Sequence, residues 1–214
     1  RDQDLDYADE DFGAFQEPMS VIDQEEALKL YDAGADIYLI TNFSSPVYVT
    51  ERKEIERGPE HYQMSMAERE RFRNLEWEMQ KYPQIQSLKE AKLLLGTRRT
   101  FGIYQIKDDS PGENYAFMNM SFIESHSMQI KKEDYKLVYV GELLGNTSLD
   151  DIFERFNIDR PKDFRGHSLS VSDIVVLNDG KKVTAHFVDS ISFEQLDSFL
   201  NLEEQVLSEL AYEV

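Results

Sequence analysis

Hydrophobic and polar positions follow a helical period at the start of the chain and then change to a strand period. An Asp-x-x-Glu start signal at Asp23, apolar residues on one helical face and a stop at Gly34 predict a short helix. Two runs rich in aromatic and β-branched residues come next, DIYLIT (36–41) and PVYVT (46–50), with a polar turn between them. These patterns predict a small α/β unit.

Two further segments have a helical pattern. Residues 65–82 open with the capping-box pattern Ser-x-x-Glu, repeat apolar residues at helical spacing and stop before Pro83. Residues 87–95 have the same kind of start and are followed by Gly96, a residue typical of helix ends. We expect a helix in each segment.

From residue 100 the pattern is dominated by short strand-like runs. They lie at 100–106, 115–122, 135–143, 173–177 and 183–189. The last two are joined by an Asn-Asp-Gly turn at 178–180, a strong hairpin signal. Between the third and fourth runs, Thr147-x-x-Asp150 predicts the start of an amphipathic helix.

These patterns predict an α+β fold. The C-terminal half is expected to form a mostly antiparallel sheet with a capping helix, and the N-terminal half a small α/β unit plus two helices. The expected parts are an acidic disordered leader (1–19), an N-terminal α+β unit (20–99), a C-terminal α+β domain (100–200) and an acidic C-terminal helix or tail (201–214).

The net charge of −19 restricts the partners of the protein. Residues 189–214 carry seven acids and no base, whereas residues 67–99 carry eight bases against five acids. A field of this sign repels phosphate backbones and attracts basic protein surfaces, so direct DNA binding is not expected over most of the surface. Arg98 and Arg99 are the exception, because no acid closely precedes them.

Several classes of site and location are excluded by what the chain lacks. It has no cysteine, which excludes disulfides, thiolate nucleophiles and cysteine zinc sites. Glycine-rich phosphate-binding motifs and His-x-x-x-His pairs are also missing, so we predict no cofactor and no metal. There is no apolar run of membrane-spanning length, and the acidic start differs from a secretory signal, which predicts a cytoplasmic protein.

The segment GHSLSVSDIVVLNDGKKVTAHFVDS (166–190) contains the residue types that a nucleophile, a base and an orienting group require. The candidates are His167, Ser168, Asp173, His186 and Asp189. On an alternating strand, however, His186 need not meet His167. Ser170 and Asp173 are also well suited to set backbone geometry in a structural hairpin. We favour the hairpin and assign no catalytic residue.

Four stretches of the C-terminal half resemble the YodL-type domain of Firmicutes mobile elements. They are TFGIYQIK, YKLVYVGEL, LDDIFERFNIDRPKDFRGHSLSVSDIVVL and AHFVDSISFEQLDSFL, and they span residues 100–200. The resemblance implies a setting in conjugative plasmids, integrative elements and phages, where the domain often accompanies helicase, methylase and antirestriction modules. It implies no catalytic residue and leaves the N-terminal half unassigned.

Charge and resemblance together favour an acidic protein that binds and inhibits a host defence nuclease, of the anti-CRISPR or antirestriction type. It would mimic DNA by occupying a basic nucleic-acid-binding surface. The expected partner-binding residues are Asp150, Asp151, Asp189, Glu194, Asp197, Glu203, Glu204, Arg98 and Arg99, with Tyr115, Tyr135 or Phe193 as exposed aromatic anchors.

Two alternatives stay open. One is a nuclease or nucleic-acid-modifying enzyme that uses His167, Asp173, His186 and Asp189. In that case Arg98 and Arg99 would steer the substrate. The other is a non-inhibitory scaffold module of a conjugation or replication complex.

Overall fold

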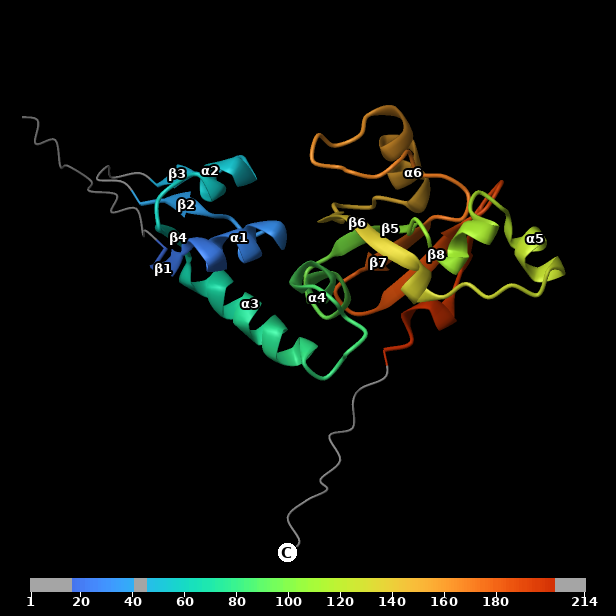
Figure 1. The fold of residues 1–214 in the computed structure, drawn as a ribbon, viewed down its shortest axis with the longest axis horizontal. Coiled ribbons are helices and arrows are strands. Elements are labelled where there is room, and N and C mark those ends of the chain that lie inside the picture. Colours follow the sequence, from blue (N-terminus) through green and yellow to red (C-terminus); the bar gives the residue numbers. More distant parts are fainter. Residues whose placement is uncertain (1–16, 41–45, 203–214) are drawn as a thin grey trace, which may run out of the picture. The chain divides into compact units, whose positions relative to one another are not determined.

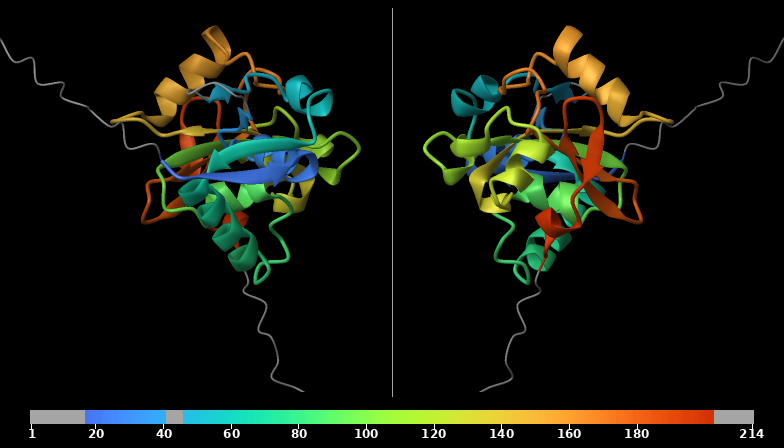
Figure 2. Two further views of the ribbon diagram at one scale, coloured as in Figure 1. Left: turned by 90° about the vertical axis from the view of Figure 1, so that its left-hand side faces the viewer. Right: turned by 90° about the vertical axis from the view of Figure 1, so that its right-hand side faces the viewer.

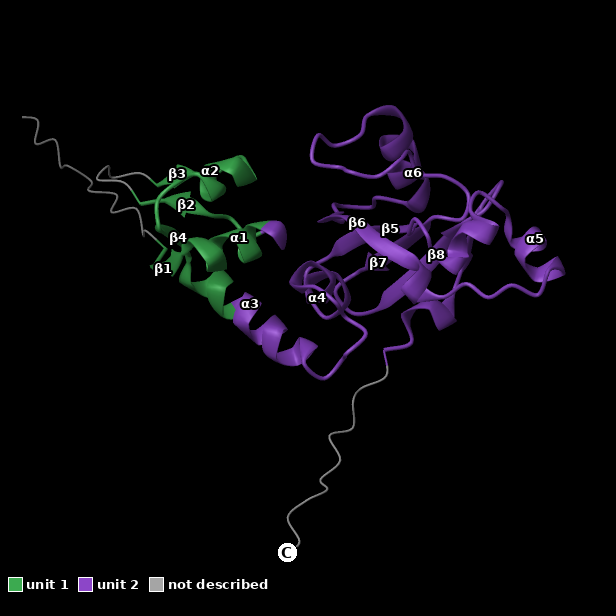
Figure 3. Ribbon diagram, in the orientation of Figure 1, with its two compact units in different colours: residues 1–31, 35–70 green, residues 32–34, 71–214 purple. Residues whose placement is uncertain are grey.

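The computed structural model describes residues 17–40 and 46–202 of the chain. Residues 1–16 of the predicted leader and residues 203–214 of the predicted tail lie outside the described residues. Contacts divide the chain into two compact units, 1–31 with 35–70 and 32–34 with 71–214 (Figure 3). The second unit therefore includes segment 71–99, which the sequence pattern assigns to the first.

The first unit contains a four-stranded antiparallel sheet (Figure 1). Its strands lie in the order β1 (Met19–Asp23), β4 (His61–Ser65), β2 (Tyr38–Leu39) and β3 (Val47–Tyr48). The helices are α1 (Gln24–Asp32), α2 (Arg52–Glu56) and α3 (Met66–Met79), the last of which crosses the boundary at residue 70. Strands β2 and β3 fall within the predicted runs, whereas β1, β4 and α2 carry no prediction.

The second unit contains a five-stranded antiparallel sheet. Its strands lie in the order β6 (Tyr135–Glu142), β5 (Thr100–Ile106), β7 (Ile174–Asn178), β8 (Val183–Val188) and β9 (Phe193–Gln195). The predicted Asn-Asp-Gly turn joins β7 to β8, and the Asn178 Oδ1 accepts a hydrogen bond from the Gly180 amide at 2.8 Å. An α+β fold with antiparallel sheets is therefore confirmed, and β9 is an edge strand.

Helices cover both faces of this sheet. On one face α6 (Leu149–Ile158) buries Phe156 against aromatic rings, with centroids 5.9 Å from Phe101 of β5 and 5.0 Å from Tyr139 of β6. On the other face lies α4 (Leu88–Leu94), as the views in Figure 2 also show. A Cβ at Gly102 would stand 2.3 Å from the Leu93 Cδ2, so glycine lets α4 pack directly on β5.

Two sequence-based predictions are wrong. Residues 115–122 do not form a strand: a 3-10 helix, η1 (Pro111–Tyr115), precedes a turn, and α5 (Met120–Ser125) follows it. The backbone of Phe117 is left-handed (φ 62°), and the Asn119 side chain caps α5 by accepting from the Phe122 amide at 2.9 Å. The cap of α6 is Ser148, one residue after the predicted Thr147, because Ser148 and Asp151 form the capping box.

Within residues 17–40 and 46–202, no helix combines the length and the apolar character that crossing a membrane would require.

Candidate functional site

The loop 159–173 leads from α6 to β7 and carries His167, one of the predicted candidates. Phe164 and Leu169 of this loop are buried in the core cluster. At the end of α6 the Asn157 amide donates to the Leu169 carbonyl oxygen at 3.0 Å. The loop is therefore held against the domain by apolar burial and by a side-chain hydrogen bond.

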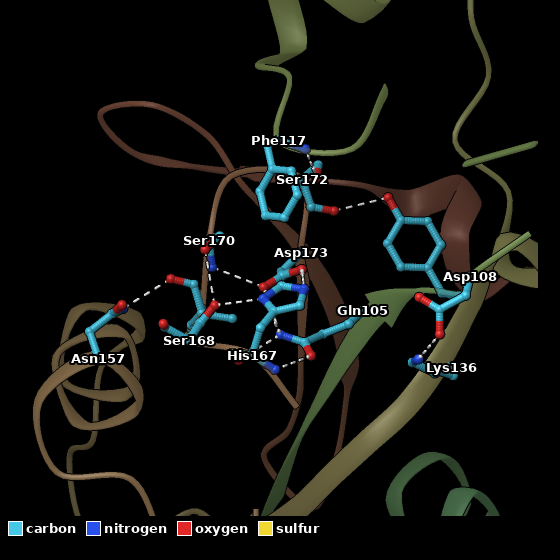
Figure 4. A network of polar contacts seen from close by, with 12 residues as sticks. Gln105, Asp108, Phe117, Lys136, Asn157, His167, Ser168, Ser170, Ser172 and Asp173 are labelled. Carbon is cyan, nitrogen blue, oxygen red and sulfur yellow. Dashed lines mark hydrogen bonds and ion pairs between the residues drawn. The ribbon is translucent and has the colours of Figure 1, made fainter. Parts of the chain in front are cut away.

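Asp173, which is 2% exposed, is the centre of a polar network (Figure 4). Its Oδ2 accepts hydrogen bonds from the Gln105 Nε2 at 3.0 Å and the Ser170 amide at 2.9 Å. The His167 Nε2 lies 3.7 Å from its Oδ1. The Gln105 side chain also donates to the His167 carbonyl at 2.9 Å and accepts from the His167 amide at 3.1 Å. Gln105 thus ties the loop to β5, an interior strand of the sheet.

The carboxyl group of Asp173 titrates in an unusual range. Burial raises its pKa from 3.8 to about 7, against the opposing effects of His167, the Ser170 amide and the Gln105 side chain. The His167 side chain remains 45% exposed, so its ring touches both the buried carboxylate and solvent. A half-exposed imidazole beside a buried acid can exchange protons with solvent, as general bases do.

A nucleophile beside this pair is not evident among the contacts. Ser168 takes part through its carbonyl oxygen, which accepts from the Ser170 Oγ at 3.0 Å and lies 2.8 Å from the His167 Nδ1. These contacts orient the loop. Among the described residues, no serine hydroxyl forms the hydrogen bond to His167 that a serine nucleophile requires for acyl transfer.

Two residues next to Asp173 have left-handed backbones. Ser172 has φ 74° and Phe117 has φ 62°, and both conformations are uncommon for residues with a side chain. The Phe117 amide donates to the Ser172 Oγ at 2.8 Å, while the Ser172 carbonyl accepts from the Tyr135 hydroxyl at 3.0 Å. The Phe117 ring lies 5.6 Å from the His167 ring and is 63% exposed. The network therefore presents an aromatic side chain to solvent.

The four catalytic candidates separate into three places. His167 and Asp173 come together, but His186 sits on β8 and its Nε2 lies 2.9 Å from the Thr184 Oγ1. Burial and then the charge of Lys182 lower the pKa of His186. None of the described contacts joins His186 to His167. Among the described residues there is also no group of three or more His, Asp or Glu that could hold a metal ion.

Asp189 belongs to a separate group of carboxylates at the edge of the sheet. Its Oδ1 accepts from the Ser190 amide at 2.7 Å and from the Met120 amide at 3.3 Å. Burial on its own would raise the pKa of Asp189, but these and other hydrogen bonds, including one with Glu194, lower it. The pKa of Glu194 is raised by burial, by that hydrogen bond, and by the charges of Asp189 and Glu124. We call Glu124, Asp189 and Glu194 the acidic edge.

Other predicted partner-binding residues are dispersed. Asp150 and Asp151 lie in the first turn of α6, where Asp151 accepts from the Ser148 amide at 2.8 Å and so serves the cap. Asp197 is exposed and accepts from the Gln195 side chain at 2.6 Å. Glu203 and Glu204 lie outside the described residues.

Arg98 and Arg99 lie at the far end of the sheet from Asp189. They precede Thr100, which pairs with Asn178 next to the start of β8, whereas Asp189 follows the last residue of that strand. Six strand residues span about 20 Å, so the arginine pair is not part of the acidic edge. Both arginines are exposed.

Two of the three predicted aromatic anchors are wrong. Tyr115 and Tyr135 are each only 3% exposed, because both pack in the interior, with ring centroids 6.5 Å apart. Phe193 is half-buried and packs on Phe153 of α6. The exposed apolar side chains near the acidic edge are instead Phe117 and Ile191, the latter 99% exposed in the β8–β9 turn.

The sequence reasoning also missed Gln105, Phe117 and Ser172. A signal existed for Gln105, since a polar residue near the end of the apolar run TFGIYQI is unusual for a buried strand and indicates a specific partner. No local pattern marks the left-handed conformations of Phe117 and Ser172.

The fold and contacts of the second unit describe an α+β domain with a buried Asp–Gln–His network and an acidic edge. Residues 100–199 match the family model of the YodL-like domain. The family model does not extend to the N-terminal half. No curated protein and no solved structure shows significant similarity to the chain.

Proposed function

We propose that this protein is a non-enzymatic inhibitor from a mobile element that acts in the bacterial cytoplasm on a host defence nuclease of the CRISPR or restriction type. It covers the basic surface on which the nuclease holds nucleic acid and excludes the substrate by competition. The net charge of −19 and the mobile-element setting implied by the YodL resemblance support this proposal.

The acidic edge is the observation on which the proposal depends. Asp189 and Glu194 lie close enough to shift each other's pKa, and the charge of Glu124 adds to the rise at Glu194. No lysine or arginine forms an ion pair with these three residues within the described part of the chain. A cationic group from a partner would relieve the repulsion among them, which makes the edge complementary to a basic surface.

Apolar anchors lie next to the acidic edge. Ile191 stands in the turn between Asp189 and Glu194, and Phe117 lies three residues before Met120, whose amide bonds to Asp189. Charges at the rim of an interface mainly speed association, whereas buried apolar side chains supply most of the affinity. Ile191 and Phe117 take the anchoring role that the sequence assigned to Tyr115 and Tyr135.

A capture experiment with a charge-reversal pair tests the proposal. The tagged full chain is mixed with a panel of CRISPR and restriction nucleases at low ionic strength, and binding and nucleic-acid cleavage are measured. We expect one nuclease to be retained and inhibited, with binding that weakens as salt rises. The Glu194→Lys variant should associate about tenfold more slowly.

The matched control is Glu142→Lys, which makes the same charge change at an exposed position. Glu142 pairs with Thr100 at the end of the sheet that is remote from Asp189, so its reversal should leave binding nearly unchanged. If both variants lost binding equally, net charge and not the acidic edge would explain the effect. A panel without any complex at low salt contradicts the proposal, and capture without inhibition would indicate the scaffold role.

The His167–Asp173 pair favours a second candidate function, a nuclease or nucleic-acid-modifying enzyme. The supporting observation is the half-exposed imidazole held 3.7 Å from a buried carboxylate. Incubation of the purified chain with DNA and RNA tests this alternative. Activity that is lost in His167→Ala and kept in His186→Ala, with both variants folded, would favour the enzyme over the inhibitor.

A further inference from the structure

A cleft of about 860 Å³ lies apart from both the acidic edge residues and the His167 network. It is formed by the segment around η1 and by the segment from Ser127 to η2 (Lys132–Asp134), close to α5 in the chain (Figure 1). Its volume falls within the range of pockets that hold ligands, roughly 300–1,000 Å³. The cleft lies entirely within the second unit.

Acidic groups predominate in the lining of this cleft. Three carboxylates, from Asp109, Glu133 and Asp134, face one cation, Lys131. Tyr115 and Met128 contribute aromatic and thioether surface beside these charges. This combination suits a ligand with a positive charge on an apolar stem, because the carboxylates attract the charge and the apolar walls cover the stem.

Asp134 is the residue that points most directly to a ligand. It is 4% exposed, and one of its carboxylate oxygens, Oδ2, accepts a hydrogen bond from the Tyr115 hydroxyl at 3.2 Å. In the described ranges the other oxygen has no hydrogen-bond donor, and the carboxylate has no ion pair. That oxygen is not sealed off in the interior, because Asp134 lines the cleft, so the carboxylate keeps an acceptor that a cationic ligand can reach.

The position of Asp134 is set by the backbone and does not depend on a ligand. Its carbonyl accepts from the Lys107 amide at 2.8 Å, and its amide donates to the Lys131 carbonyl at 3.0 Å. Burial, and then the charge of Asp134, raise the pKa of Tyr115 to about 12, so the hydroxyl remains a donor. The carboxylate is therefore held in place at the cleft before anything binds.

We propose that this cleft receives an arginine side chain from a basic segment of the partner, with Asp134 accepting from the guanidinium. This inference rests on the proposed function, because it names the kind of group that a basic partner inserts. Arginine fits better than lysine, since its planar fork of donors can satisfy the free carboxylate oxygen while its stem lies on the thioether of Met128. Asp109 and Glu133 accept a second basic residue beside it.

The test uses the full chain and a small probe, N-acetyl-Arg-Arg-amide, followed by NMR titration of backbone amides and methionine methyl groups. We expect saturable shifts at Met128 and at the amides of the cleft, with an affinity on the order of millimolar for so small a ligand. The same dipeptide with citrulline in place of arginine has the shape without the charge and should not bind.

Two variants identify the residue responsible. Asp134→Asn keeps an acceptor for the Tyr115 hydroxyl and removes the charge, and it should weaken binding about tenfold. Asp159→Asn makes the same charge change at an exposed position just after α6 and should bind like the parent. Lys131→Gln removes the competing cation of the cleft and should strengthen binding about twofold.

Three results would overturn the inference: no shifts at millimolar probe, equal binding by the parent and Asp134→Asn, or displacement of the probe by Mg²⁺ or Ca²⁺, which would indicate a cation site. Each of these leaves the proposed function separately testable. The nuclease capture depends on Glu194, whereas this titration involves no nuclease.

Discussion

Replacing Asp173 with asparagine should remove a pH dependence from the stability of the YodL-like domain. The asparagine oxygen can still accept from Gln105 and Ser170, the two donors that hold the carboxylate. Its amide group can face the imidazole of His167. The variant therefore keeps the shape and the hydrogen bonds of the network and loses only the ionisable group.

The sign and size of the effect follow from the pKa of Asp173. Burial raises it from 3.8 to about 7, so between these two values the folded chain keeps a proton that the unfolded chain has lost. Stability contributed by this proton is present at low pH and is lost as the pH rises toward 7. Full ionisation would cost at most about 4 kcal/mol, since each pKa unit corresponds to 1.36 kcal/mol.

Denaturant unfolding of both proteins between pH 5 and pH 8, followed by circular dichroism, measures this contribution. The difference between variant and parent cancels the titrating groups that are remote from Asp173. Tyr135 also faces Asp173 but has a pKa raised far above this pH range, whereas the contribution of His167, which interacts with Asp173, stays in the difference. We expect the variant to be the more stable protein at pH 8 and to lose more than half of this advantage by pH 5, since the rest is lost only as the pH falls to the unfolded-state pKa of 3.8. A flat difference, or an advantage that grows as the pH falls, would refute the reasoning.

Three further substitutions test other parts of the structure. Phe156→Ala empties the centre of the aromatic core and should cost about 3–5 kcal/mol of unfolding free energy in denaturant titrations; a cost below about 1 kcal/mol would contradict the packing. Gly102→Ala forces α4 away from β5 and should cost about 1–3 kcal/mol, part of which Leu93→Ala should restore in the double variant. Asp134→Asn removes a buried charge that lacks a cation and should raise the unfolding free energy by on the order of 1 kcal/mol, seen as a higher melting temperature. A lower melting temperature would show that the carboxylate is already compensated.

Local signals were sufficient for the elements that carry their own pattern. The run TFGIYQI has the composition of a buried strand, and the Asn-Asp-Gly turn specifies the β7–β8 hairpin without help from the rest of the chain. By contrast, β1 and β4 are only half-buried, and each depends on the other across a wide separation, with Met19 opposite Ser65. Pairing of that kind leaves little trace in a local window.

The segment 115–122 shows how tertiary contacts override composition. Its aromatic and apolar residues favour a strand, but the Phe117 amide is satisfied by Ser172, which lies far away in the sequence. That bond holds Phe117 in a left-handed conformation, and Asn119 then starts a helix. The same limit applies to the candidate site: His167 and Asp173 were chosen by residue type, whereas Gln105, which joins them, comes from a strand 62 residues before His167.

Net charge predicts that the protein attracts a basic partner, but it does not identify the carboxylates that are available to bind that partner. Asp173 is satisfied from within by Gln105, Ser170 and His167, so its carboxyl group serves the structure. The Glu194 carboxylate has mainly other carboxylates beside it, and Asp134 has one hydroxyl and an open cleft. A cation that approaches the domain gains most at the last two places, because there it removes repulsion or completes a buried group. Mutations at those positions should therefore change binding far more than equal changes of charge elsewhere on the surface.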